Sequence, residues 1–365
     1  MSTLRTAVIG AGHLGRIHAK LLAQVDGAEL AAISDPIEPA RENAAKLFSV
    51  PTFADYRDCI ENVDAAVIAA PTDAHARIAT DFLKAGKHVL VEKPLTIERA
   101  DASRLAMFAT SRKLTLQVGH VERFNPAFTA LEKLAVDVKY VEAVRASSFP
   151  GRCLDVGVVM DLMIHDLDLV LSLTDAAVQS VSASGLAVIS NHDDLAEARI
   201  EFECGLVANL KASRVSPTPA RQMQVYSSNG FADIDFGAPS LSVVRPCETV
   251  VTRSFDLAGE TDDPLSYSGR LFSERLRCET LDLEPRNAIL DELHDFVISV
   301  QTGIAPTVDG AAGARAVDLA QQVLESIDQR IWYADATTAE VGPHASARER
   351  IEDASRRIHQ DRRAA

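Results

Sequence analysis

The sequence predicts a doubly wound α/β domain with a parallel sheet, followed by an α+β domain with an open, mainly antiparallel sheet. Three observations predict this fold class. The first half alternates strand-like and helix-like segments, the region from Val138 to Val251 is mostly short strand-like runs, and 365 residues is long for one hydrophobic core. We therefore expect domains over residues 1–121 and 122–335, followed by a charged tail over 336–365.

The elements of the first half follow one another as strand, helix and strand. Strand-like segments lie at residues 6–11, 28–35, 64–71, 88–94 and 114–120, and helix-like segments at about 14–25, 38–48, 75–85 and 97–111. Helices of this length between strands imply right-handed crossovers. Such crossovers make the strands parallel and cover both faces of the sheet.

The second half is mostly short strand-like runs around one helix-like segment. The runs lie at residues 139–148, 178–188, 197–205, 206–215, 222–230 and 231–236, and two later helix-like stretches lie at 286–302 and 311–331. Consecutive strands joined by short turns imply an antiparallel sheet. The late helices are expected to complete the second domain.

The composition argues against several functional classes. A formal net charge of −15 argues against general nucleic-acid binding, so an anionic substrate would need a local cationic pocket. No apolar run is long enough to span a bilayer and no signal region precedes the first strand, so we expect a cytoplasmic protein that binds no membrane. The five scattered cysteines contain no Cys-x-x-Cys pair, so neither a disulfide framework nor a metal site is expected.

A glycine-rich turn lies between the first strand and the first helix. Gly10, Gly12 and Gly15 follow the G-x-G-x-x-G spacing. Gly10 suits a tight turn, Gly12 the close approach of a pyrophosphate and Gly15 helix–strand packing, with His13 and Leu14 beside the phosphates at the helix N-terminus. The alternative is a glycine turn without a ligand. Because the glycine-rich turn lies directly after a strand and opens a helix, a Rossmann dinucleotide-binding domain is favoured over this alternative.

The second strand ends at Asp35. This spacing is compatible with the acidic residue that binds the adenosine ribose hydroxyls in an NAD site. A carboxylate there would repel the 2′-phosphate of NADP, and no arginine follows Asp35 immediately. The sequence therefore favours NAD over NADP.

Polar residues also follow two further strands of the predicted sheet. Glu92 and Lys93 stand at the end of a buried strand, and Pro71, Thr72 and His75 follow the strand before it. Ligands bind doubly wound sheets at this carboxyl edge, so we expect these residues near the cofactor. The alternative for Lys93 is an ordinary surface lysine at a strand end.

A narrow polar stripe interrupts the apolar segment from Val158 to Leu173. Asp161, His165, Asp168 and Ser172 fall within an arc roughly 60° wide on a helix that is otherwise almost entirely apolar. A solvent-facing side would be broader. The stripe is either a short exposed edge with a satisfied core histidine or the polar wall of a cavity.

These motifs occur together in one order: Gly10-x-Gly12-x-x-Gly15, "VEKP", "GHVERFNP" and Asp161-x-x-x-His165-x-x-Asp168. In this combination the chain resembles the glucose-fructose oxidoreductase and inositol dehydrogenase family, from residue 6 to about residue 331. The resemblance implies a Rossmann domain with an open antiparallel sheet. It also implies that the protein oxidises or reduces a carbon of a sugar or cyclitol with a nicotinamide cofactor.

The same resemblance implies that Lys93 and His165 act on the substrate hydroxyl, with Asp161 beside them. Oxidation of a secondary alcohol needs a base for the hydroxyl proton, and histidine suits this task at neutral pH. Lys93 would stabilise the developing alkoxide. Asp161 either orients His165 or accepts a substrate hydroxyl, and Asp168 is interpreted as a cap or brace outside the catalytic set.

The motifs around the polar stripe look most like the branch of this family that oxidises C3 of UDP-N-acetylglucosamine. Arg123, Asn125 and Arg152 are then candidates for polar contacts to the diphosphate, with Asp161 and His165 also facing the sugar. The alternatives are a dehydrogenase of a free cyclitol or aldose and a non-catalytic NAD-sensing protein. We expect a homodimer or homotetramer.

Overall fold

The computed structural model describes residues 3–134, 136–149, 156–254, 271–333 and 339–343. The chain divides into two compact units that interleave along the sequence. The first unit comprises Met1–Phe124, Gly151–Leu171 and Arg286–Gln322, and the second comprises Asn125–Pro150, Ser172–Pro285 and Val323–Ala365. The consecutive domain bounds expected from the sequence remain a prediction.

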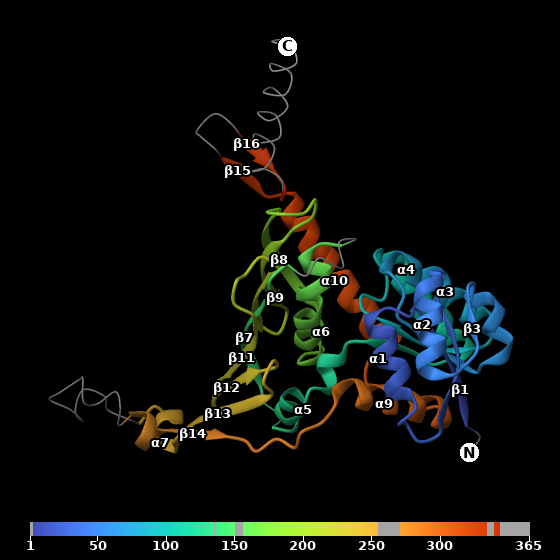
Figure 1. Ribbon diagram of the computed structural model, residues 1–365. Coiled ribbons are helices and arrows are strands. Elements are labelled where there is room, and N and C mark those ends of the chain that lie inside the picture. Colours follow the sequence, from blue (N-terminus) through green and yellow to red (C-terminus); the bar gives the residue numbers. More distant parts are fainter. Residues whose placement is uncertain (1–2, 135, 150–155, 255–270, 334–338, 344–365) are drawn as a thin grey trace, which may run out of the picture. The chain divides into compact units, whose positions relative to one another are not determined.

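A six-stranded sheet forms the centre of the first unit, and all its neighbouring strands are parallel (Figure 1). Its spatial order is β3-β2-β1-β4-β5-β6. The strands are β1 (Leu4–Ile9), β2 (Ala28–Ser34), β3 (Thr52–Phe53), β4 (Ala65–Ile68), β5 (His88–Glu92) and β6 (Leu116–Gly119). The predicted doubly wound parallel sheet is confirmed. The edge strand β3 was not expected, because its two residues are too few to give a periodic pattern.

Helices of the first unit pack in groups around this sheet. The helices are α1 (His13–Leu22), α2 (Glu38–Phe48), α3 (Thr72–Lys84), α4 (Arg99–Arg112), α9 (Ala288–Thr302) and the start of α10 (Gly310–Asp328), with the 3-10 helices η1 (Tyr56–Asn62) and η2 (Val121–Phe124). Helix α1 contacts α2 and α9, and α3 contacts α4. Phe296 of α9 is fully buried in one core cluster with Val8, Val67 and Leu90 of the strands. Helix α9 therefore completes the core of the first unit, although the sequence had suggested the second domain.

An eight-stranded sheet forms the second unit, in the order β14-β13-β12-β11-β7-β10-β9-β8. The strands are β7 (Val138–Ala146), β8 (Val178–Leu186), β9 (Leu195–Phe202), β10 (Val207–Ser213), β11 (Ala220–Ser227), β12 (Gly230–Asp235), β13 (Ser240–Pro246) and β14 (Leu276–Thr280). Only β7 and β10 pair in parallel among these neighbours. The predicted open, mainly antiparallel sheet is confirmed.

Local sequence explains the shape of several elements in the second unit. Strand β9 alternates outward and buried side chains, as expected for a strand with one solvated face. Asn125 caps helix α5 by accepting a hydrogen bond from Ala127, and Pro126 occupies the first turn. The remaining described elements of this unit are α5 (Pro126–Lys133), α7 (Glu248–Val251), the π-helix η4 (Leu271–Arg275), β15 (Ile331–Tyr333) and β16 (Ala339–Val341).

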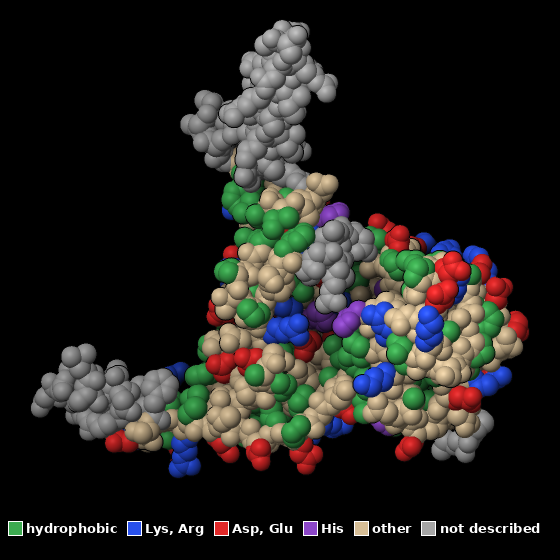
Figure 2. Space-filling model, viewed as in Figure 1, with side chains coloured by type: hydrophobic (Ala, Val, Ile, Leu, Met, Phe, Trp, Pro, Cys, Tyr) green, Lys and Arg blue, Asp and Glu red, His purple; other side chains and the backbone are tan. Residues whose placement is uncertain are grey.

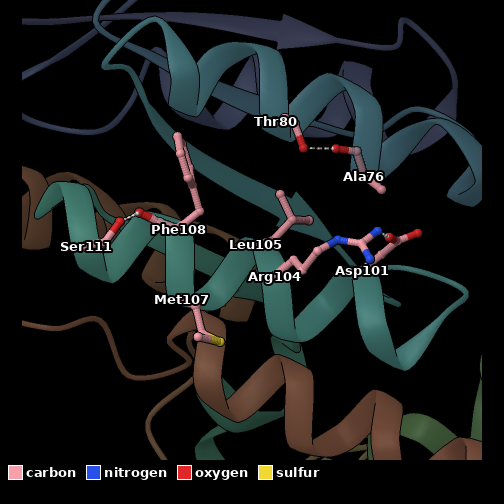
Figure 3. A pocket seen from close by; sticks show the side chains of 8 residues that line it. All are labelled: Ala76, Thr80, Asp101, Arg104, Leu105, Met107, Phe108 and Ser111. Atoms are coloured by element: carbon pink, nitrogen blue, oxygen red, sulfur yellow. Dashed lines mark hydrogen bonds and ion pairs between the residues drawn. The ribbon is translucent and has the colours of Figure 1, made fainter.

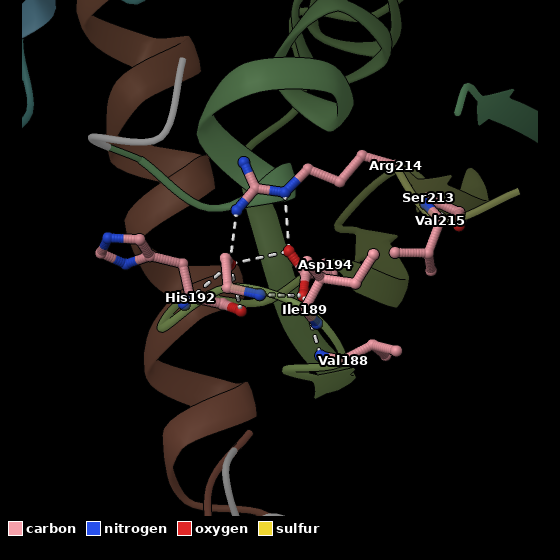
Figure 4. A network of polar contacts seen from close by, with 8 residues as sticks. Val188, Ile189, His192, Asp194, Ser213, Arg214 and Val215 are labelled. Atoms are coloured by element: carbon pink, nitrogen blue, oxygen red, sulfur yellow. Dashed lines mark hydrogen bonds and ion pairs between the residues drawn. The ribbon is translucent and has the colours of Figure 1, made fainter. Parts of the chain in front are cut away.

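A buried ion pair holds the second unit together near the end of β10 (Figure 4). Arg214 Nε donates to Asp194 Oδ1 over 2.8 Å, and both side chains are fully buried. The other carboxylate oxygen accepts from the amides of Val188, Ile189 and Ser190. Burial opposes ionisation, yet these amides and Arg214 hold the pKa of Asp194 well below its usual range. Both charges are thus compensated.

Acidic and basic side chains are interspersed over the described surface on the face shown in Figure 2. No large patch of a single charge sign stands out among the described side chains on this face. Among the described residues, no helix has the length and hydropathy that a membrane span requires.

Candidate active site

The turn between β1 and α1 has the backbone that the glycine spacing predicts. Gly10 adopts φ +100°, and a Cβ placed there would lie 2.4 Å from the Ala69 carbonyl oxygen. A Cβ on Gly15 would lie 1.8 Å from the Gly10 carbonyl oxygen. Both positions therefore require glycine for the fold itself, whether or not a ligand binds.

Gly12 differs, because a Cβ placed there would meet nothing within 4 Å. The fold leaves open space at this position, as the close approach of a phosphate requires. Gly12 is also the N-cap of α1, which has no side-chain cap and no acidic residue in its first turn. Backbone N–H groups at such a helix end suit an anion, so the turn fits a cofactor pyrophosphate. His13 and Leu14 line the same opening.

Two backbone amides hold Asp35 at the end of β2. Its Oδ2 accepts from Ala11 N over 2.7 Å, and its Oδ1 accepts from Ile37 N over 2.8 Å. The side chain thus stands in a defined orientation at the wall of a cavity of ≈ 700 Å³. An oriented carboxylate here fits the ribose hydroxyls of an adenosine.

Three residues that line this cavity were not identified from the sequence. Tyr56, Arg57 and Arg77 line it, and both guanidinium groups lie over the Tyr56 ring, at 5.1 Å for Arg57 and 5.4 Å for Arg77. Arg77 also donates to the Tyr56 hydroxyl over 2.9 Å. Tyr56 and Arg57 lie in η1, a short 3-10 helix without a periodic signal, and only the fold brings them to the cavity.

Lys93 stands directly after β5, as the sequence predicted, and its ammonium group is bound twice. Lys93 Nζ donates to the Asp161 backbone oxygen over 2.5 Å and to Asp161 Oδ1 over 3.0 Å. The two side chains are only 15% and 12% exposed, so this is no ordinary surface lysine. Only the family resemblance placed Asp161 beside Lys93, and this hydrogen-bonded pair was not expected from the sequence.

Lys93 and Asp161 line a second cavity of ≈ 240 Å³. Pro71, Thr72, His75 and Glu92 line it too, as expected for residues at neighbouring strand ends. This cavity and the larger one share Leu14, Ala69, Ala70 and Pro71, so they adjoin. The arrangement fits a dinucleotide whose reactive ring reaches Lys93.

Glu92 and His75, which line this cavity, also contact groups on other segments of the first unit. Glu92 Oε1 lies 2.6 Å from His18 Nε2. Burial acts to raise the pKa of Glu92, but His18 and Lys93 outweigh burial and hold this pKa below its usual value. His75 Nδ1 and Nε2 each lie 2.9 Å from a carbonyl oxygen, of Pro94 and Ala70 respectively. These two side chains brace the loops that carry Lys93.

The polar stripe lies on a helix that is less regular than the sequence predicted. Val159–Met163 forms a π-helical turn, η3, and α6 (Ile164–Ser172) follows it. The expectation of one regular α-helix from Val158 is therefore corrected. A π-turn holds an extra residue, which changes the register of Asp161 relative to His165, and such turns are frequent at functional sites. Asp161 is buried and His165 half-buried.

His120 is a site residue to which sequence reasoning gave no role. Its ring packs against His165, with centroids 6.3 Å apart and planes at 89°. His120 lies in the quoted segment "GHVERFNP", so the motif was visible but its partner on α6 was not. The stripe therefore meets a buried histidine as well as Lys93.

The three residues proposed for the diphosphate have different surroundings. Arg123 is half-buried, and its Nε has no hydrogen-bond partner among the described residues. Asn125 is buried, caps α5 and donates to the Phe236 carbonyl oxygen over 3.4 Å. Arg152 lies outside the described residues. A substrate contact of any of the three stays a prediction.

Another cavity, of ≈ 510 Å³, lies between α3 and α4 (Figure 3). Leu105, Met107 and Phe108 give it an apolar wall, and Arg104 pairs with Asp101 at its side. It holds no group suited to the proposed chemistry. The described residues also contain no cluster of three or more side chains that could hold a metal ion.

Two family models match the chain. One is described as an oxidoreductase family with an NAD-binding Rossmann fold and matches residues 4–120, and the other is the GFO/IDH/MocA C-terminal domain and matches residues 137–233. The chain belongs to the GFO/IDH/MocA oxidoreductase family. This membership confirms the predicted resemblance, and it makes the protein an oxidoreductase with NAD as the cofactor. The alternative of a non-catalytic sensor is set aside.

The names of relatives in the GFO/IDH/MocA family describe dehydrogenases of a nucleotide sugar and of a cyclitol. UDP-N-acetylglucosamine 3-dehydrogenase of Acidithiobacillus ferrooxidans is 36% identical over 90% of this chain and 98% of its own. A solved structure of that enzyme covers 89% of this chain and 98% of its own with a TM-score of 0.78. Myo-inositol 2-dehydrogenase of Thermotoga maritima is 29% identical over 90% of this chain and 97% of its own. The protein is thus a sugar oxidoreductase of the NAD type.

Proposed function

We propose that this protein oxidises a secondary hydroxyl of a nucleotide sugar with NAD, namely the C3 hydroxyl of UDP-N-acetylglucosamine, to give a 3-keto sugar. The observation that carries the proposal is the buried Lys93–Asp161 pair at the end of the cavity. A lysine fixed by two hydrogen bonds at the carboxyl edge of a Rossmann sheet stands where a reacting hydroxyl would lie.

Three side chains divide the proposed chemistry. When bound, the nicotinamide accepts the hydride that leaves the alcohol carbon. His165 accepts the hydroxyl proton as the general base. Lys93 stabilises the negative charge that develops on the oxygen, and Asp161 holds the Lys93 ammonium group in place. The products are the ketone, the reduced cofactor and a proton that leaves through His165.

Asp35 sets the preference for NAD in this proposal. Its two oxygens are oriented by Ala11 and Ile37, so the carboxylate is preorganised to accept ribose hydroxyls. A 2′-phosphate would meet the same negative charge. Arg41 Nη1 donates to the Asp35 and Pro36 carbonyl oxygens, so that nitrogen is already engaged.

Arg123 supports a diphosphate substrate over a neutral sugar. Lys93 and Arg123 both act electrostatically on His120, so both cations lie near the proposed reaction centre. A buried guanidinium nitrogen that lacks a partner suits a charge-assisted hydrogen bond to phosphate. The similarity to a UDP-N-acetylglucosamine 3-dehydrogenase favours the same substrate. Similarity to inositol dehydrogenases supports the second candidate, a free cyclitol or aldose.

The test is a substrate panel with NAD. UDP-N-acetylglucosamine should give NADH and a product lighter by two hydrogens, measured by absorbance and mass spectrometry. Arg123→Gln should raise KM for the UDP-sugar about 10- to 100-fold with less effect on kcat, because a hydrogen bond to a charged group is lost. Arg112→Gln, at an exposed arginine of α4, is the matched control. Turnover of inositol or a free aldose but of no UDP-sugar would move the protein to the second candidate.

A further inference from the structure

His120 is a fully buried histidine whose polar atoms make no hydrogen bond. The side chain follows β6 in the first unit and is 1% exposed. Neither Nδ1 nor Nε2 has a hydrogen-bond partner among the described residues. His75 in the same unit, by contrast, has a carbonyl oxygen 2.9 Å from each ring nitrogen. His120 is therefore not a satisfied core histidine.

A packing role alone does not account for a histidine here. Burying a donor and an acceptor without partners costs free energy, whereas an apolar ring of similar shape would fill the space without that cost. Asp168 shows the same feature on α6, because it is 3% exposed and its Oδ2 has no partner among the described residues. Two buried polar groups are thus available to other partners.

Charged groups surround the His120 ring on several elements. Burial lowers the pKa of His120, and the charge of Asp168 on α6 is the strongest influence in the opposite direction. Lys93 and Arg123 also lower this pKa, and Glu92 raises it. The ring is therefore neutral at physiological pH, with one N–H and one acceptor nitrogen.

The ring of His165 lies directly beside this neutral histidine, at 6.3 Å between centroids and 89° between planes. We propose that His120 is a positioning residue for His165, and that its acceptor nitrogen binds the His165 N–H on the ring nitrogen opposite the one that takes the substrate proton. Hydrogen bonds of this kind are often long without substrate and shorten in the reactive complex. The inference rests on His165 as the base in the proposed function.

Protonation of His120 would abolish this role. A charged imidazole has two donors and no acceptor, and it would add a third cation to Lys93 and Arg123. Burial therefore contributes to the positioning role, because it keeps His120 neutral.

Two substitutions separate a polar role from a packing role. His120→Phe keeps a ring but removes both nitrogens, and His120→Gln loses the ring shape but keeps an acceptor oxygen. We expect kcat of His120→Phe to fall about 10- to 100-fold, the range for a lost hydrogen bond to a charged group. Its melting temperature should stay equal or rise, because unpaired buried nitrogens are removed. KM for NAD should not change.

The ranking of the two variants decides the matter. His120→Gln should retain a higher kcat than His120→Phe, and the acid limb of the kcat–pH profile should shift in the Phe variant. His88→Phe, at the amino-terminal end of β5 and so away from the carboxyl edge of the sheet, is the control and should leave kcat unchanged. A Phe variant with wild-type kcat and pH profile, or with a higher kcat than the Gln variant, would overturn the proposal.

Failure of the base assignment can be told apart from failure of this inference. Undiminished kcat in His165→Ala would remove His165 as the base and the inference with it. An inactive His165→Ala beside an unaffected His120→Phe would overturn the inference alone. Nitrogen NMR of labelled histidine gives a readout that needs no turnover. The His165 ring resonances should move in His120→Phe, and unchanged resonances would count against the contact.

Discussion

The two units each bury a cluster of charged side chains, but the clusters differ in how completely they are satisfied. In the second unit, the Asp194 carboxylate accepts bonds from Arg214, Ser190 and three backbone amides. In the first unit, Lys93 is bound to Asp161, yet neighbouring His120 and Asp168 retain buried atoms without partners among the described residues. Burial alone therefore does not distinguish them.

The difference indicates what each cluster does. A network in which the charges are compensated holds loops in one arrangement. Removing one partner leaves the other charge buried and uncompensated. A cluster with unmet hydrogen-bonding capacity is less favourable for the fold but is available to a substrate or to a proton in transit. We expect mutations in the second unit to act on stability and mutations in the first to act on turnover.

Breaking the Asp194–Arg214 pair should have the largest effect on stability. Arg214→Ala should lower the free energy of unfolding by about 3–5 kcal/mol, because Asp194 stays buried and charged. Urea denaturation followed by circular dichroism measures this change. The exposed pair Arg245–Glu279 in the same sheet is the control, and Arg245→Ala should cost less than about 1 kcal/mol. Equal costs would erase the contrast between buried and exposed pairs.

Removing Lys93 should affect turnover rather than stability. Lys93→Met should lower kcat by about 10²- to 10⁴-fold, because the cation beside the reacting oxygen is lost. NAD binding, measured by calorimetry, should persist. Lys84→Met, at an exposed lysine of α3, is the matched control. The assignment of the two clusters would be reversed if Lys93→Met lost as much free energy of unfolding as Arg214→Ala but kept the wild-type kcat.

Glu292 on α9 extends the comparison to pH. Burial, and secondarily the negative charges of Glu92 and Asp295, raise the pKa of Glu292 well above 4.5, and neither carboxyl oxygen has a partner among the described residues. A raised folded-state pKa gives stability that is full below the unfolded value and is lost as pH rises through the folded value. Within that window the slope is about 1.4 kcal/mol per pH unit.

Glu292→Gln should therefore flatten the decline of stability above pH 4.5. Urea midpoints at pH 5, 7 and 9 compare the variant with the wild type. Glu98→Gln, at an exposed glutamate before α4, serves as the control and should leave the slope intact. A wild-type slope in the Glu292 variant would mean that another buried group causes the decline.

Asp35 sharpens the comparison, because its oxygens are satisfied by amides as those of Asp194 are, yet it lines a cavity. Asp35→Ala should lower kcat/KM for NAD about tenfold and narrow the preference over NADP, because a charge-assisted hydrogen bond is lost. Steady-state kinetics with both cofactors measure it. Asp26→Ala, at an exposed residue, is the control. Equal kcat/KM for NAD and NADP in the wild type would contradict this role.

Much of the first unit was predictable because its signals are local. Strand and helix periods give the parallel sheet, the glycine spacing gives the turn, and the ends of β2 and β5 give Asp35 and Lys93. The two-residue strand β3 is too short for a periodic signal, and the sequence around η3 has the periodicity of a regular α-helix, so neither β3 nor the π-helical turn could be predicted. The same holds for Tyr56 and Arg57 in η1.

The sequence by itself determined the fold class, the phosphate-type turn and which side chains stand at the carboxyl edge of the sheet. Only the tertiary structure decided that Lys93 binds Asp161 across 68 residues, that His120 meets His165, and that α9 closes the first core with Phe296. The physical reason is range. Periodicity and turn chemistry act over a few residues, whereas hydrogen bonding and burial depend on which distant segments the packed core brings together.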